Sequence, residues 1–266
     1  MADLSNISIL DHEEISDFIF INRDNWNSPQ ESSEDHLIEI DNNASINARF
    51  YFKNPDSTNI LLFHANAESP IDYDGLKQDF FSINVNLFVA SYRGYGNGIG
   101  TPTIINSLHD SENIFDYFKK VLSDKNANGP IIIMGKAIGS LSALYIASHH
   151  NEEISGIITE SSFSGPKYCA EISGVELTQD QQNELENFSH ELCNSITSPA
   201  LLIHGESDFM IPITEAQILF DLLGSKAKDI ITIPEADHGN LVILGEEYYW
   251  WAIEEFIYTH CNISPY

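Results

Sequence analysis

Three positions of the sequence follow the order of a hydrolytic triad, but the first has an alanine where the triad needs a nucleophile. Residues 135–139 read Gly-Lys-Ala-Ile-Gly, the frame of the Gly-x-Ser-x-Gly turn between a strand and a helix. That turn lifts a nucleophilic serine above the edge of a sheet, and Ala137 occupies the serine position. A methyl group cannot attack a carbonyl carbon. We therefore expect no acyl transfer from this turn as it stands.

An acid and a histidine follow in the chain order nucleophile, acid, base. Asp208 and His238 each come shortly after an apolar run. In such chemistry the imidazole takes the nucleophile's proton, and the acid fixes the tautomer and stabilises the imidazolium. Glu160 ends another apolar run and is an alternative acid, whereas Asp237 adjoins the histidine, and neighbouring side chains on an extended loop diverge. We favour Asp208, whose loop is restricted by Pro212.

Two backbone N–H groups must also stabilise the oxyanion of such a reaction. One belongs to the residue after the nucleophile, which is Ile138 here. The other lies in the loop after an earlier strand, where residues 64–67 read His-Ala-Asn-Ala, and we expect Asn66 to supply it. We interpret His64 as a structural turn residue. Ten histidines occur, none with a zinc-ligand spacing to cysteine or glutamate, so we expect no metal site.

The elements that must position these groups follow from the pattern of apolar residues. Continuous apolar runs occur at residues 59–63, 86–90, 130–134, 156–160, 199–205 and 229–234. Such runs are typical of parallel strands buried on both faces. Between several of these runs lie segments with the residue spacing or composition of a helix, at residues 107–123, 140–147 and 214–223. This alternation predicts a doubly wound, mostly parallel α/β sheet.

Two segments modify this plain alternation. Residues 36–40 and 46–52 predict an antiparallel hairpin around the turn-forming sequence Asp-Asn-Asn, which would extend the sheet on one side. Residues 163–198 are longer than a crossover requires, and they form either a small cap or an ordinary crossover helix with a long loop. If a cap, Phe163 and Tyr168 should wall an acyl pocket, because they follow a strand end that faces the site. No repeat or linker is present, so residues 1–266 predict a single domain.

Composition restricts the partners. Forty acidic and twelve basic residues give a net charge of −28, a field that repels nucleic acid and anionic membranes. The acidity fits a solvated surface, salt adaptation or cationic partners. No apolar run approaches the roughly 18 residues of a membrane helix, and no signal peptide is visible. Cys169, Cys193 and Cys261 are far apart, so free thiols and a cytoplasmic location are expected. Nothing in the pattern indicates an oligomeric state.

Taken together, these segments resemble the α/β-hydrolase superfamily, specifically its small, minimally capped serine-hydrolase branch. The resemblance covers nearly the whole chain and is carried by residues 63–68, 92–96, 135–139, 160–161, 204–212 and 237–241. It implies an α/β-hydrolase fold and an esterase, thioesterase or lipase that needs no cofactor and takes a small-molecule or acylated substrate. The chain departs from the family pattern at Ala137, where the family has serine, and at Ala65, where the family has glycine.

Two hypotheses account for the missing serine. In the first, the chain is an engineered, inactive variant of a serine hydrolase that cleaves a carboxylic ester or thioester through an acyl-enzyme. In the second, it is a natural pseudoenzyme that binds a ligand or a protein without turnover. Loss of the serine alone costs a comparable triad a factor of about 10⁶ in kcat. We favour the first hypothesis, because a binding protein has no chemical use for a matched aspartate and histidine.

Overall fold

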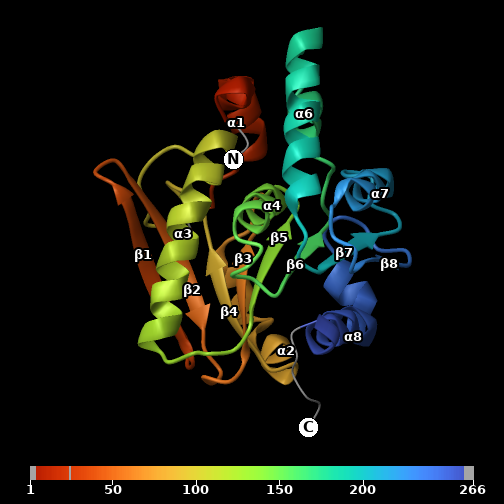
Figure 1. The fold of residues 1–266 in the computed structure, drawn as a ribbon. Coiled ribbons are helices and arrows are strands. Elements are labelled where there is room, and N and C mark those ends of the chain that lie inside the picture. Colours follow the sequence, from red (N-terminus) through yellow and green to blue (C-terminus); the bar gives the residue numbers. More distant parts are fainter. Residues whose placement is uncertain (1–3, 24, 261–266) are drawn as a thin grey trace.

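The computed structural model describes residues 4–23 and 25–260, which form an eight-stranded sheet covered by helices on both faces (Figure 1). The strand order is β1-β2-β4-β3-β5-β6-β7-β8. The strands are β1 (Ser33–Asp41), β2 (Ala44–Tyr51), β3 (Thr58–Phe63), β4 (Val85–Ala90), β5 (Ile131–Lys136), β6 (Gly156–Glu160), β7 (Ala200–Gly205) and β8 (Lys228–Ile233). The neighbours from β4 to β8 are parallel, which confirms the predicted mostly parallel sheet.

Helices cover the two faces of the sheet unequally. They are α1 (Glu13–Ile19), α2 (Lys77–Ser82), α3 (Ile104–Asp124), α4 (Gly139–His149), α5 (Pro166–Ile172), α6 (Gln179–Ser195), α7 (Ile213–Leu222) and α8 (Leu241–His260), with 3-10 helices η1 (Leu4–Asp11) and η2 (Pro70–Asp74). One core cluster joins the sheet to α1, α3, α4, α6 and α7, and the other joins it to α2 and α8. Leu61 faces the first cluster and Leu62 the second, as alternation along a doubly buried strand requires.

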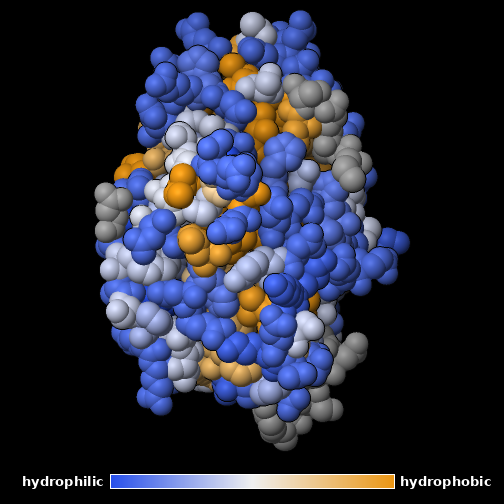
Figure 2. All heavy atoms as spheres, turned by 90° about the vertical axis from the view of Figure 1, so that its left-hand side faces the viewer, coloured by the Kyte–Doolittle hydropathy of each residue, from blue (hydrophilic) through white to orange (hydrophobic). Residues whose placement is uncertain are grey.

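The predicted hairpin is confirmed. β1 pairs antiparallel with β2, and β2 pairs antiparallel with β4, so the hairpin extends the parallel sheet. At the turn, the backbone N–H of Asn43 donates to the carboxylate of Asp41 over 2.7 Å. β1 is the outer edge, and its acidic side chains discourage pairing with a further strand. Figure 2 faces this side of the molecule, which is mainly hydrophilic with separate hydrophobic areas.

Three features of the fold differ from the expected pattern. The sequence did not predict η1 and α1, although Ile7, Leu10 and Ile15 are fully buried. It did not predict the long C-terminal helix α8 either. β8 was expected to be buried on both faces, but only Ile233 is fully covered there, because β8 is the last strand of the sheet and has a neighbour on one side only.

Residues 163–198 contain α5 and α6. Thr178 caps α6 by accepting the backbone N–H of Gln181, whose side chain accepts the backbone N–H of Thr178 in return. α6 packs against α4 and η1 and returns the chain from β6 to β7, as a crossover helix does. α5 contacts α1 and α6 and lies between the end of β6 and this crossover. The segment therefore includes a crossover helix, and a cap role for its first half stays a prediction.

Two of the three cysteines lie in the described part of the chain. Cys169 and Cys193 are buried free thiols, and burial raises the pKa of Cys193 to about 12. The third cysteine, Cys261, lies outside the described residues. Among residues 4–23 and 25–260, no helix combines the length and the apolar character needed to cross a bilayer.

Candidate active site

The turn after β5 has the backbone geometry of a nucleophile elbow. Ala137 has a φ of +47°, in the left-handed region that side-chain-bearing residues rarely adopt. A Cβ at Gly135 would lie 2.5 Å from the Cα of Ser140, and one at Gly139 would lie 2.1 Å from the carbonyl oxygen of Phe63. Both glycines are therefore required by the close approach of α4 to the sheet. The frame of the elbow is present, and its side chain is a methyl group.

Asp208 and His238 form a pair. The Nδ1 atom of His238 lies 2.9 Å from Oδ2 of Asp208. Oδ1 of Asp208 accepts the backbone N–H groups of Met210 (2.9 Å) and Ile211 (2.8 Å), which fixes the carboxylate. Burial opposes its ionisation, but the hydrogen bonds from His238 and Ile211 outweigh burial and lower the pKa of Asp208. A carboxylate only accepts, so Nδ1 carries the proton and Nε2 is left as the base.

The two alternative acids have other partners. Glu160 lies with Oε1 3.2 Å from Nζ of Lys136, and its Oε2 accepts the hydroxyl of Tyr249 over 2.5 Å. Asp237 accepts the backbone N–H of Gly239 over 2.9 Å and so stabilises the turn that carries the histidine. Within the described residues, neither carboxylate is hydrogen-bonded to His238. The geometry thus pairs the histidine with Asp208.

Ala137 and His238 line one cavity of about 160 Å³ at the carboxyl ends of the strands. Its wall also includes Ala65, Asn66, Glu68, Ser161 and Leu241. Asn66 thus lies beside the elbow, as the sequence predicted for an oxyanion donor. In the part of the chain that the structure describes, no hydrogen bond uses the backbone N–H of Asn66 or of Ile138. Both groups remain available to an oxyanion.

Hydrogen bonds hold the loop that carries Asn66. The side-chain oxygen of Asn66 accepts the backbone N–H of Ile21 over 2.9 Å. His64 is fully buried, with Nδ1 2.8 Å from the carbonyl oxygen of Ala65 and Nε2 3.0 Å from the hydroxyl of Ser91. Burial lowers the pKa of His64, so the ring is neutral. These contacts fit the structural role that we expected for His64.

A largely buried ion-pair network in the wall of the cavity was not predicted from the sequence. Nζ of Lys136 lies 2.9 Å from Glu68 and 3.2 Å from Glu160. Burial opposes the charge on Lys136, but the two carboxylates outweigh burial and raise its pKa. Burial also opposes ionisation of Glu68, and Lys136 overcomes it to lower the pKa of Glu68 to about 2. The available signal was a lysine closing an otherwise apolar strand, which requires a carboxylate partner.

Glu68 connects this network to the oxyanion loop. Its Oε2 accepts the backbone N–H of Ala65 over 3.1 Å and the hydroxyl of Tyr73 over 2.8 Å. The loop after β3 is thereby tied to Lys136, the residue directly before the elbow position. The network therefore sets the relative position of the loop after β3 and the turn after β5, where we expect the oxyanion N–H groups.

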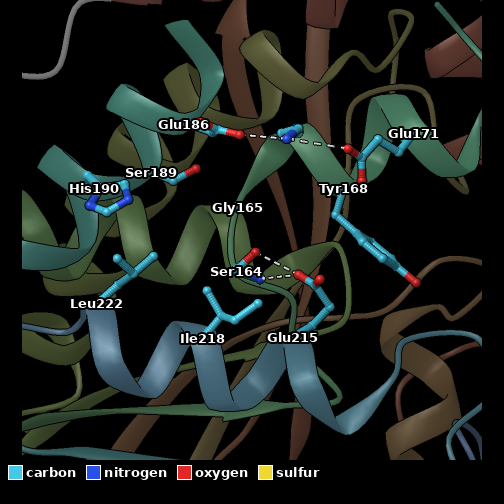
Figure 3. A pocket seen from close by; sticks show the side chains of 11 residues that line it. Ser164, Gly165, Tyr168, Glu171, Glu186, Ser189, His190, Glu215, Ile218 and Leu222 are labelled. Atoms are coloured by element: carbon cyan, nitrogen blue, oxygen red, sulfur yellow. Dashed lines mark hydrogen bonds and ion pairs between the residues drawn. The ribbon is translucent and has the colours of Figure 1, made fainter. Parts of the chain in front are cut away.

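Phe163 and Tyr168 lie away from this cavity. Phe163 is buried and stacks on Tyr168 with ring centroids 5.7 Å apart. Tyr168 lines a separate cavity of about 290 Å³ between α5, α6 and α7. Figure 3 shows Glu215 turned toward Ser164 in this cavity, while Tyr168 points away from the α6 side chains. The structure thus brings Ala137, His238 and Asn66 around one cavity, with Asp208 behind the histidine, and places Tyr168 at another.

This chain is similar to known proteins in sequence and in fold. The sequence model of the family described as serine aminopeptidase, S33, matches residues 54–179. Protein bem46 of Schizosaccharomyces pombe is 28% identical over 238 residues, which are 85% of this chain and 78% of that protein. The Pyrococcus furiosus esterase Pf2001 superposes with a TM-score of 0.72 at 16% identity, covering 91% of this chain and 99% of the other. This chain has the α/β-hydrolase fold. Est1E from Butyrivibrio proteoclasticus, solved with ferulic acid, shares it with a TM-score of 0.67 at 19% identity, covering 86% and 100%.

Within the α/β-hydrolase fold, the parts of the site fall at their expected places. The elbow follows β5, the acid follows β7 and the histidine follows β8, all at the carboxyl edge of the parallel strands, where open α/β sheets bind ligands. The family model matches less than half of the chain, and the solved structures share its fold.

Proposed function

We propose that this site is built to hydrolyse a carboxylic ester or thioester through an acyl-enzyme, and that Ala137 deprives its elbow of the nucleophile. The Asp208–His238 hydrogen bond carries the proposal, because it leaves Nε2 as a base beside an elbow of correct geometry. With a serine at position 137, His238 would take its proton as the oxygen attacks the acyl carbon. The N–H groups of Asn66 and Ile138 would stabilise the oxyanion, and His238 would return the proton to the leaving group.

The substrate class rests on two considerations. The structural neighbours from Pyrococcus furiosus and Butyrivibrio proteoclasticus are an esterase and a ferulic acid-bound protein. The cavity at Ala137 is small, about 160 Å³, so it suits the reacting acyl group rather than a large leaving group.

Free thiols at Cys169 and Cys193 remain the basis for proposing a cytoplasmic location.

The decisive experiment restores the oxygen. We expect Ala137→Ser to hydrolyse p-nitrophenyl acetate or butyrate at least about 10³-fold faster than the chain with alanine, since a triad serine contributes about 10⁶. The variant should also be labelled by a fluorophosphonate probe. His238→Ala, added to Ala137→Ser, is the matched control and should abolish both effects. If the folded Ala137→Ser protein neither labels nor turns over any ester or thioester, the pseudoenzyme hypothesis replaces this proposal.

We also propose that Phe163 and Tyr168 shape the acyl-chain preference. The hydroxyl of Tyr168 donates to the carbonyl oxygen of Met210 over 2.6 Å, so α5 is joined to the loop that begins at Asp208. Phe209 in that loop is 91% exposed and offers apolar surface next to the site.

A chain-length series tests this role. In the Ala137→Ser background, Tyr168→Ala should change the ratio of kcat/KM for octanoate and acetate esters by about tenfold, the scale of one or two buried methylenes. Acetate hydrolysis itself should change little. Phe220→Ala is the control, because Phe220 lies on α7 but does not line the cavity of Tyr168. An unchanged ratio would leave residues 163–198 as a plain crossover.

A further inference from the structure

The turn after β6, the strand next to β5, has the same backbone conformation as the elbow and carries a serine. Ser161 directly follows β6 and has a φ of +47°, the same value as Ala137 after β5. The backbone N–H of Ser161 donates to the carbonyl oxygen of Ile203 on β7 over 2.9 Å. In the same way, the N–H of Ala137 donates to the carbonyl oxygen of Glu160 on β6 over 2.9 Å. Each parallel ladder thus continues for one residue and then turns sharply.

Ser161 lies beside the elbow, on the strand that is one position nearer to β8. Lys136 is in register with Glu160, so positions 137 and 161 are neighbours on adjacent strands, which are about 4.8 Å apart. His238 follows β8, and the strand order is β5-β6-β7-β8. Ser161 is therefore two strand spacings from β8, about 10 Å, whereas Ala137 is three, about 14 Å. An imidazole that reaches the elbow must pass the end of β6, and Ser161, Ala137 and His238 line one cavity.

The hydroxyl of Ser161 has no structural task in the described part of the chain. Its Oγ is buried and has no hydrogen-bond partner there. Its neighbour Ser162 is buried too, but that hydroxyl donates to Oγ1 of Thr159 over 3.0 Å. A buried hydroxyl without a partner lowers stability unless a ligand completes it. Rotation about the Cα–Cβ bond of Ser161, a residue that lines the cavity, would break no hydrogen bond of its hydroxyl.

We propose that Ser161 is a second nucleophile of this site, served by the same Asp208–His238 pair. This step rests on the hydrolytic function proposed above. Oγ of Ser161 attacks the acyl carbon, and its proton passes to Nε2 of His238. The bond from the acyl carbon to the leaving oxygen or sulfur breaks as His238 returns that proton to the leaving group. Water, with His238 again as base, then attacks the acyl-Ser161 ester, which releases the carboxylic acid and restores the hydroxyl.

The experiment uses the chain with Ala137 and a fluorophosphonate probe, followed by peptide mapping. We expect one labelled peptide carrying Ser161, more slowly labelled than position 137 of the Ala137→Ser variant. Ser161→Ala should abolish the label and lower p-nitrophenyl acetate hydrolysis at least about tenfold, as loss of a nucleophile requires. Ser162→Ala is the matched control and should leave both unchanged. Ser161→Cys should be alkylated by iodoacetamide at position 161. Circular dichroism should show that each variant is folded.

The outcomes separate this inference from the proposed function. If Ala137→Ser is labelled and active while the chain with Ala137 is not labelled at Ser161, the second nucleophile is excluded and the proposed function stands. If Ser161 is labelled but Ala137→Ser adds nothing, the elbow proposal fails and the assignment of Ser161 stands. Labelling that survives Ser161→Ala, or that appears equally at Ser162, also overturns the assignment.

Discussion

The chemistry that we propose for this site depends on two residues, Asp208 and His238. The carboxylate of Asp208 accepts two backbone N–H groups and the imidazole N–H at the same time. It is therefore held ionised and in one orientation, which fixes the tautomer of His238. A second imidazole, that of His204, lies near Asp208 with Nε2 2.8 Å from the carbonyl oxygen of Ile211, and burial lowers its pKa. A neutral His204 adds no competing charge to Asp208.

The assignment of the acid is tested by comparing conservative amides. In the Ala137→Ser background, Asp208→Asn should lower kcat by about 10⁴, because an amide favours the wrong tautomer of the histidine. Asp237→Asn is the matched control, since Asp237 adjoins the histidine but accepts only the N–H of Gly239, and kcat should stay within a few-fold. Glu160→Gln should cost far less than Asp208→Asn in steady-state kcat of the folded protein. A larger effect of Glu160→Gln would move the acid to Glu160.

At this scale, the spacing of residues in the sequence predicted the elbow, whereas position along the chain left alternatives for the acid. The elbow was recognisable because Gly135 and Gly139 stand at fixed offsets from position 137, and the structure shows backbone contacts at both glycines. Glu160 ends one strand and Asp208 comes shortly after another, so the sequence could not separate them by position. The separation comes from Lys136, whose charge is neutralised by Glu160, and such a pairing across strands is not visible in one sequence.

At the scale of elements, the Lys136 network joins three segments around the cavity. It connects the loop after β3 through Glu68, the end of β5 through Lys136 and the end of β6 through Glu160. Tyr249 on α8 closes the network at Glu160. Removing one member of a buried ion pair leaves the other charge uncompensated, which costs more than the pair contributes. The network is therefore expected to position the Asn66 loop against the elbow.

Glu68 makes this expectation measurable through pH. Its pKa in the folded protein is about 2, below the ordinary 4.5. A depressed pKa contributes stability that is complete above about pH 4.5 and is lost as the pH falls toward 2. Glu68→Gln should lower the free energy of unfolding at pH 7 by roughly 1–3 kcal/mol and flatten its decline below pH 4.5.

Chemical denaturation between pH 2.5 and 7 measures both effects. Glu186→Gln is the control, because Glu186 pairs with Lys167 on the surface and is 52% exposed, so its loss should cost well under about 1 kcal/mol. An unchanged acid limb in Glu68→Gln would show that the Lys136 network contributes nothing to folding. The same variant, combined with Ala137→Ser, should lower kcat through displacement of the oxyanion loop.

Among the elements, the sequence predicted those whose apolar residues are continuous or strictly spaced. The parallel strands and the hairpin were found because burial on both faces, or a polar turn between two short runs, leaves a local pattern. η1 and α1 were missed because their buried residues, such as Ile7 and Ile15, lie in short polar stretches without a full helical period. Their burial comes from contacts of η1 with α3 and α6, which are distant in sequence.

At the scale of the whole molecule, the dominant property is a net charge of −28 on 266 residues. Like charges over the surface repel one another and destabilise the compact state. Within the described residues, seven of the twelve lysine and arginine side chains form ion pairs with carboxylates, such as Arg49 with Asp35 and Arg93 with Asp110. Further attraction between exposed groups is therefore limited, and repulsion among the excess carboxylates should prevail at neutral pH.

This balance predicts that salt stabilises the protein. Raising NaCl from 20 to 500 mM shortens the screening length from roughly 20 Å to about 4 Å, which removes most repulsion between exposed carboxylates. The melting temperature at pH 7.5 should rise by several degrees, about 1–2 kcal/mol for a chain of this length. At pH 4.5, next to the isoelectric point of about 4.4, the rise should shrink because the net charge is close to zero. Scanning calorimetry at both pH values measures the difference. A melting temperature that falls with salt at pH 7.5 would mean that the surface ion pairs outweigh the repulsion, and that the acidity serves a purpose other than tolerance of salt.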